Sequence, residues 1–132
     1  MAYDPRNLPQ GALDFLTERH LASLTLLRAD GSPHVTAVGI TWDDSNQLVR
    51  VITWDGSMKA RLLSASDGGR ASVCQIDGGR WLTLEGEALV TADSDRCAEG
   101  LRRYAERYRP PADRGADRRV IEISIDKVMG RA

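Results

Sequence analysis

Cysteine, histidine and lysine are scarce in this sequence, and their scarcity argues against several kinds of site. The 132 residues include two cysteines, two histidines and two lysines, against sixteen arginines. Cys74 and Cys97 belong to no CxxC motif, so we interpret them as small buried residues and not as a disulfide. His20 and His34 have no cysteine or carboxylate neighbours at metal-ligand spacing, and we therefore expect no metal site.

Long apolar runs and an excess of positive charge are also missing. No stretch approaches the roughly 18 consecutive apolar residues of a membrane span, and MAYDPRNLPQ lacks the apolar core of a signal peptide. We therefore expect a cytoplasmic protein that does not enter a membrane. The net charge of −1 argues against general nucleic-acid binding. The length and the 42% hydrophobic content predict a single domain over residues 1–132.

The chain does contain a series of short strand-like runs joined by glycine turns. Asp30-Gly31 marks a turn between two such runs, in the second of which His34, Thr36 and Val38 alternate with Val35 and Ala37. Further strands are expected over 48–54, 67–77, 80–91 and 120–130, and Gly86 predicts a bulge. Six short strands with hairpin turns predict a mainly β fold, an antiparallel barrel with flanking short helices.

The last of the three expected helices, over residues 93–109, combines an apolar stripe with many arginines. Ala98, Leu101, Ala105 and Tyr108 trace its apolar face. The arginines of this helix and the loop after it have two interpretations, a solvated surface or a clamp for an anionic ligand. They are Arg96, Arg102, Arg103, Arg107, Arg109, Arg114, Arg118 and Arg119.

The segment DGSMKARLL holds Lys59, one of the two lysines, at the start of a short expected helix. Ser57 is a candidate N-cap, and Lys59 and Arg61 place two cations in its first turn. Helix N-termini present free N–H groups that suit a phosphate, and lysine supplies a compact charge. The alternative is an amphipathic helix with two solvated cations. GxSxG, P-loop and GxGxxG motifs do not occur.

Four segments carry a resemblance to a known family: RHLASLTLLRADGSPHVTAVGITWD, VRVIT with GSMKA, QIDGGRWLTLEGEA and RVIEISIDKVMG. With them the chain resembles the split-barrel flavin and deazaflavin oxidoreductases, which are similar to pyridoxamine 5'-phosphate oxidase in fold. Within that superfamily it resembles the coenzyme F420-dependent branch and its F420H2-dependent biliverdin reductases. The segments LRADGSPHVTAVG and DGGRWLTLEG favour this subgroup.

The resemblance implies a homodimer of six-stranded split barrels with the cofactor in a groove at the dimer interface. It implies hydride transfer from reduced F420 to a conjugated substrate such as biliverdin. A clamp for propionates or for the glutamate tail of F420 would draw on Arg107, Arg109, Arg114, Arg118 and Arg119. FMN in place of F420, and an F420 carrier without turnover, remain alternatives. The residues implied for cofactor binding are His34, Val35, Thr36, Ala37, Val38, Thr53, Ser57, Met58, Lys59, Arg61, Gln75, Ile76, Asp77, Gly78 and Trp81.

Overall fold

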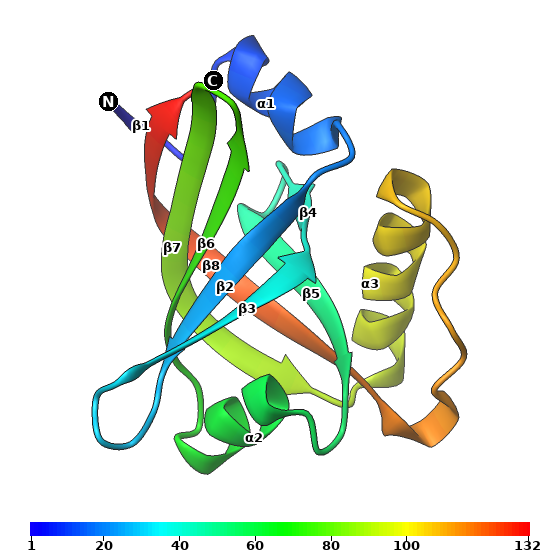
Figure 1. The fold of residues 1–132 in the computed structure, drawn as a ribbon. Coiled ribbons are helices and arrows are strands. Elements are labelled where there is room, and N and C mark those ends of the chain that lie inside the picture. The colour runs from blue at the N-terminus through cyan, green and yellow to red at the C-terminus, as the bar shows by residue number, and fades with distance from the viewer.

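The computed structural model describes all residues 1–132, and its eight strands form one curled antiparallel sheet (Figure 1). The order across the sheet is β3-β2-β6-β7-β8-β5-β4, with β1 paired to β8. The predicted antiparallel barrel is confirmed, and all six predicted strands are present together with two short ones, β1 and β4. The strands are β1 (Ala2–Tyr3), β2 (Leu21–Leu27), β3 (Pro33–Gly39), β4 (Thr41–Asp43), β5 (Leu48–Trp54), β6 (Gly69–Asp77), β7 (Arg80–Thr91) and β8 (Arg118–Arg131).

Three helices flank the sheet at different places: α1 (Gln10–Thr17), α2 (Met58–Ala65) and α3 (Ser94–Arg107). The Ser57 side chain accepts a hydrogen bond from the Ala60 N–H, which confirms it as the cap of α2. Asp93 caps α3 by accepting from the Arg96 N–H. A 3-10 turn at Gly115–Asp117 precedes β8. None of the helices is both long and apolar enough to cross a lipid bilayer.

The core fills the inside of the curled sheet, and strand alternation decides which side chains enter it. In β2, Leu24 and Leu26 are buried whereas Leu21 and Leu27 are exposed. Phe15 of α1 lies fully buried among the core residues. Each large apolar side chain removed from water in this way contributes about 1.5–3 kcal/mol to stability.

The longest strand, β8, pairs with β1, β5 and β7 and is buried on both faces along its first half. Ile121, Ile123 and Ile125 point into the core, as predicted. Glu122 points the other way and is still only 8% exposed, because Arg96 of α3 covers it with a hydrogen-bonded ion pair.

Gly86 lies at the predicted bulge in β7. The pairing of β7 with β8 shifts register between Glu85 and Gly86, which confirms the bulge. A Cβ atom at position 86 would lie 1.7 Å from the carbonyl oxygen of Ser124, so only glycine allows the two strands to approach this closely.

The prediction for the packed face of α3 is wrong in part. Cys97 and Gly100 are the buried residues of this helix, whereas Ala98 is exposed. Gly100 permits the contact, because a Cβ there would lie 2.8 Å from Cγ2 of Val120. Tyr108 does face the sheet, and its hydroxyl donates to the carbonyl of His20 at 2.6 Å. The hydrophobic pattern misled the prediction because the sheet edge offers polar backbone groups that tyrosine and arginine side chains satisfy.

Candidate functional site

The first turn of α2 presents donors that have no acceptor within the chain. The N–H groups of Met58 and Lys59 donate to nothing, whereas the next two are used by the side chain and carbonyl of Ser57. Ser57 is buried, and its hydroxyl is fixed by that of Thr53 at 2.8 Å. The helix start is therefore held by Ser57 and Thr53 and leaves two N–H donors without an acceptor in the chain.

Lys59 stands beside these donors without a counter-ion. Its Nζ makes no ion pair and lies 5.1 Å from the centroid of the Trp54 ring. Partial burial lowers the pKa of the Lys59 ammonium. An anion bound here would offset that cost. Arg61, in the same turn, is exposed and also makes no ion pair. The residues therefore fit the phosphate group that the sequence predicted.

Trp54, at the end of β5, was missed by the sequence reasoning. Besides Lys59, it contacts Arg114, whose guanidinium carbon lies 4.3 Å from the centroid of its ring. The two cations come from segments far apart in the chain and meet at one indole. The only local signal would have been an aromatic residue directly before the Asp55-Gly56 turn.

The predicted site residues of β3 divide between two faces, as the alternation predicted. His34, Thr36 and Val38 are turned to the inner side of the sheet, opposite buried residues of β2. The His34 Nδ1 is buried and has no hydrogen-bond partner. Val35 and Ala37 are exposed on the outer side.

The remaining predicted residues, Gln75 to Gly78 and Trp81, lie at the other end of the molecule. They surround the β6–β7 hairpin, whereas α2 lies where β6 begins (Figure 1). The strand from Gly69 to Asp77 spans about 26 Å at the usual rise per residue. The two groups of predicted residues thus lie at opposite ends of β6, and their joint contact with one ligand remains a prediction.

Gln75 itself is a core residue. It is fully buried, and its Nε2 donates to the carbonyl of Phe15 at 2.8 Å. Its Oε1 accepts from Arg107. With both ends of the amide occupied, Gln75 holds the strand end in place and leaves contact with a ligand to Ile76 and its neighbours.

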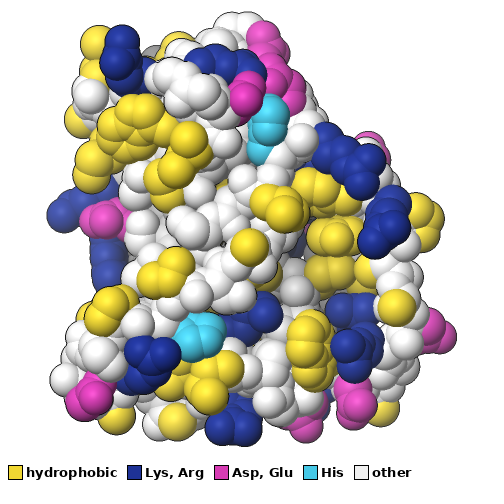
Figure 2. Space-filling model, in the orientation of Figure 1, with side chains coloured by type: hydrophobic (Ala, Val, Ile, Leu, Met, Phe, Trp, Pro, Cys, Tyr) yellow, Lys and Arg dark blue, Asp and Glu magenta, His cyan; other side chains and the backbone are white.

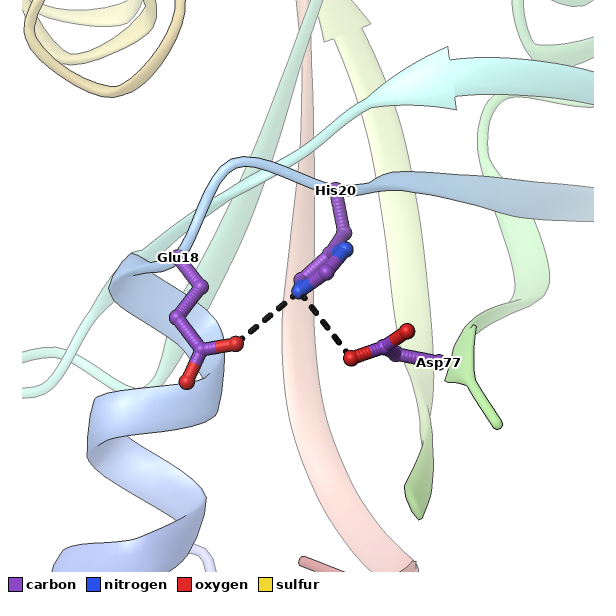
Figure 3. A group of neighbouring side chains, drawn as sticks. All are labelled: Glu18, His20 and Asp77. Carbon is purple, nitrogen blue, oxygen red and sulfur yellow. Dashed lines mark hydrogen bonds and ion pairs between the residues drawn. The ribbon is translucent and has the colours of Figure 1, made fainter. Parts of the chain in front are cut away.

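Glu18, His20 and Asp77 form a cluster that spacing along the chain did not reveal, because Asp77 arrives from a distant strand (Figure 3). The His20 Nε2 lies 3.0 Å from Oε1 of Glu18 and 3.8 Å from Oδ2 of Asp77. Arg80 makes ion pairs with Glu18 at 2.8 Å and with Asp77 at 2.6 Å. Its hydrogen bonds, followed by one from His20, lower the pKa of Glu18 to about 2. Both carboxylates thus already have a cation.

The arginine clamp remains a prediction, and three of its five candidates already have partners within the chain. Arg107, Arg118 and Arg119 donate to main-chain carbonyl groups within the chain. The side chains of Arg109 and Arg114 make no hydrogen bond or ion pair, so these two are available to an anion.

Comparison with known proteins shows which family the chain matches. Residues 8–131 match the family model described as pyridoxamine 5'-phosphate oxidase. The chain is 52% identical over 125 residues to an F420H(2)-dependent biliverdin reductase of Mycobacterium tuberculosis, covering 95% of this chain and 89% of the relative. A solved structure described as an F420 reductase superposes with a TM-score of 0.70 at 25% identity, over 92% of this chain and 98% of the other.

A putative pyridoxamine 5'-phosphate oxidase from Listeria innocua superposes with a TM-score of 0.71 at 15% identity, over 92% of this chain and 95% of the other. At this sequence identity the similarity concerns the fold alone, which is the same mainly β split barrel. The match over nearly the whole length, together with the free donors and Lys59 at α2, leads to one conclusion. The chain belongs to the pyridoxamine 5'-phosphate oxidase family.

Proposed function

We propose that this protein is an F420H2-dependent oxidoreductase that reduces biliverdin to bilirubin, and that residues 1–132 act as one split-barrel domain. The observation that carries the phosphate site is the unpaired, partly buried Lys59 beside two free N–H groups. The choice of F420 over FMN is supported by the 52% identical relative, which is described as F420H(2)-dependent. The substrate assignment is supported by the relative that is 52% identical and described as a biliverdin reductase. The cytoplasmic location remains the expectation from sequence.

The residues around α2 would hold the cofactor through its phosphate. Met58 and Lys59 would donate backbone N–H groups, and the Lys59 ammonium would add charge. Thr53 would keep Ser57 and the helix start rigid through its hydroxyl. When bound, the reduced deazaflavin would supply a hydride for the central methine carbon of biliverdin, and water would supply the proton for a pyrrole nitrogen. The chain's contribution is orientation and exclusion of water.

The separation between α2 and the β6–β7 hairpin supports a homodimer in which each cofactor touches both copies. The outer face of β2, β3 and β6 is exposed and apolar: Leu21 is 62% exposed, Val35 59% and Ile76 65%. None of the helices packs on this face, and Figure 2 shows apolar side chains gathered over the upper ends of β6 and β7. A second copy covering the face would bring its Ile76 to Gly78 and Trp81 toward the α2 end of the first.

A parallel titration with F420 and FMN tests the cofactor, and addition of biliverdin to the reduced F420 complex tests the reaction. We expect tight F420 binding and loss of biliverdin absorbance. Lys59→Ala should weaken F420 binding by tenfold or more, which is the loss of about one charged hydrogen bond. The matched control is Lys127→Ala, which removes the other lysine from an exposed position on β8.

Each alternative has its own outcome in this experiment. Preference for FMN would place the chain on the flavin side of the family. F420 binding without loss of biliverdin colour would support the cofactor assignment and refute biliverdin as the substrate. F420 binding with no turnover of any conjugated acceptor would indicate a carrier. An affinity for F420 within twofold of wild type in Lys59→Ala would refute the phosphate site.

A further inference from the structure

A groove of about 540 Å³ lies between α3 and the segment that follows it, on the outer side of that helix. Residues 109–117 run back along α3 before entering β8 (Figure 1). Ala98, Leu101, Ala105 and Pro111 provide the apolar lining, and Arg114 and Arg118 lie in the same wall. The volume is that of a site for a small molecule and is too small for a folded partner.

The apolar lining is the part of the helix that the barrel does not use. Because α3 packs on the sheet through Cys97 and Gly100, the stripe formed by Ala98, Leu101 and Ala105 is turned toward residues 109–117. That segment covers it only partly, since Ala98 remains exposed. The stripe is therefore available to the apolar part of a ligand.

The charges in the wall are unbalanced. The Arg114 side chain makes no ion pair and no hydrogen bond, and its guanidinium carbon lies 4.3 Å from the centroid of the Trp54 ring. Arg118 donates to the carbonyls of Thr53 and Ala112, but its Nε is buried without an acceptor. Burial, followed by the positive charge of Arg114, lowers the pKa of Arg118. An anion at Arg114 would relieve this repulsion.

The other charged groups nearby do not supply that anion. Arg102, at the rim, is already paired with Glu99 and Glu106. The Oδ1 of Asp113 accepts from the N–H of Gly115 and forms no ion pair with either arginine. Arg114 and Arg118 thus place two positive charges in the wall of the groove. The carboxylate of Asp113 accepts a hydrogen bond within its own turn and does not pair with them.

We propose that this groove binds an amphipathic organic anion, with its carboxylate at Arg114 and its apolar body along Ala98, Leu101 and Ala105. The proposal is argued from α3 and residues 109–117 and not from Lys59, although Arg114 and Lys59 contact the same Trp54 ring. Carboxylates of this kind could come from the propionate arm of a bilin or from a separate aliphatic acid, and the two sources can be distinguished experimentally.

The test uses the fluorescence of 8-anilinonaphthalene-1-sulfonate, an amphipathic anion, with the purified full chain and without F420. We expect Arg114→Gln and Leu101→Asn each to weaken binding of the dye at least fivefold. Arg19→Gln is the matched control, since it removes the same charge from an exposed residue outside the groove and should change binding less than twofold. Thermal unfolding checks that each variant is folded. If Leu101→Asn does not fold, the result for Arg114→Gln, a substitution on the surface, decides the test.

Competition then identifies the source of the carboxylate. Displacement of the dye by micromolar biliverdin assigns the groove to the substrate, and displacement by octanoate alone assigns it to a separate acid. Equal dye affinity in wild type, Arg114→Gln and Arg19→Gln overturns the proposal, as does a dye that neither compound displaces. Loss of F420 binding in Lys59→Ala bears on the proposed function and leaves this result unaffected.

Discussion

The Nη2 of Arg107 lies 2.6 Å from the Oε1 of Gln75, and this contact joins the last turn of α3 to the end of β6. The same guanidinium donates to the carbonyl of Glu18 through two nitrogens and to the carbonyl of Ile40 at 2.7 Å. One side chain thus connects the end of α1, the link between β3 and β4, and β6. Because no carboxylate pairs with Arg107, its hydrogen bonds to neutral oxygens must hold the charge in place.

Arg107→Ala should therefore destabilise the fold by about 3 kcal/mol, because it leaves the Gln75 Oε1 and the Glu18 carbonyl without a donor and the Ile40 carbonyl with the Tyr108 hydroxyl alone. Arg107→Lys should recover part of the loss. Urea unfolding measures both, with Arg109→Ala as a control that is expected to stay within about 0.5 kcal/mol of wild type. An Arg107→Ala protein as stable as that control would show that the hydrogen bonds of Arg107 do not contribute to the free energy of unfolding.

Gly86→Ala should be among the most damaging small substitutions in the chain. Its Cβ would meet the Ser124 carbonyl oxygen, and the two strands would have to separate at the bulge. We expect a loss of at least about 3 kcal/mol. Gly79→Ala is the matched control, since a Cβ there meets nothing within 4 Å. Chemical denaturation of the two variants checks the difference, and equal midpoints would contradict it.

Asp43 should make stability depend on pH in the acid range. Burial raises the pKa of this carboxyl, but hydrogen bonds from Asn46 and Arg50 and the charge of Arg103 more than offset it and lower the pKa to about 2. Relative to an ordinary value near 3.8, this contributes about 2 kcal/mol. A lowered pKa stabilises the fold above pH 4, and the contribution disappears as pH falls from about 4 to 2.

The comparison of wild type with Asp43→Asn isolates this residue from the other carboxyls. The variant should be less stable at pH 7, and the gap between the two proteins should narrow below pH 4. Urea midpoints at pH 7, 5, 4 and 3 provide the measurement. A gap that stays constant across this range would mean that Asp43 has an ordinary pKa.

Ile76→Asp should convert a dimer into a monomer. It places a charge in the exposed apolar face of β2, β3 and β6, where a second copy would otherwise exclude water. Sedimentation at micromolar concentration should show a dimer for wild type and a monomer for the variant, together with weaker F420 binding. Leu89→Asp, at an exposed leucine beyond the bulge, should remain dimeric. A monomeric wild type would refute the shared site.

Local chemistry made much of this molecule predictable. The Asp30-Gly31 turn, the Ser57 cap and the bulge at Gly86 each depend on a few neighbouring residues, and each is present. The face of α3 could not be read in the same way, because it depends on carbonyls that Arg107 finds on other elements. Likewise, Trp54 and Arg114 meet only because residues 109–117 return toward β5, and no local pattern records such a return.

The position of β8 in the sheet has a consequence for the chain as it leaves the ribosome. β5 has no strand partners other than β4 and β8, and β8 is the last strand in sequence order. At about 5–20 residues per second, synthesis of the stretch from Trp54 to Arg118 takes several seconds. During that interval the β4–β5 hairpin presents an open edge to other nascent chains. Translation pauses within that stretch would prolong this exposure and favour misassembly between neighbouring chains.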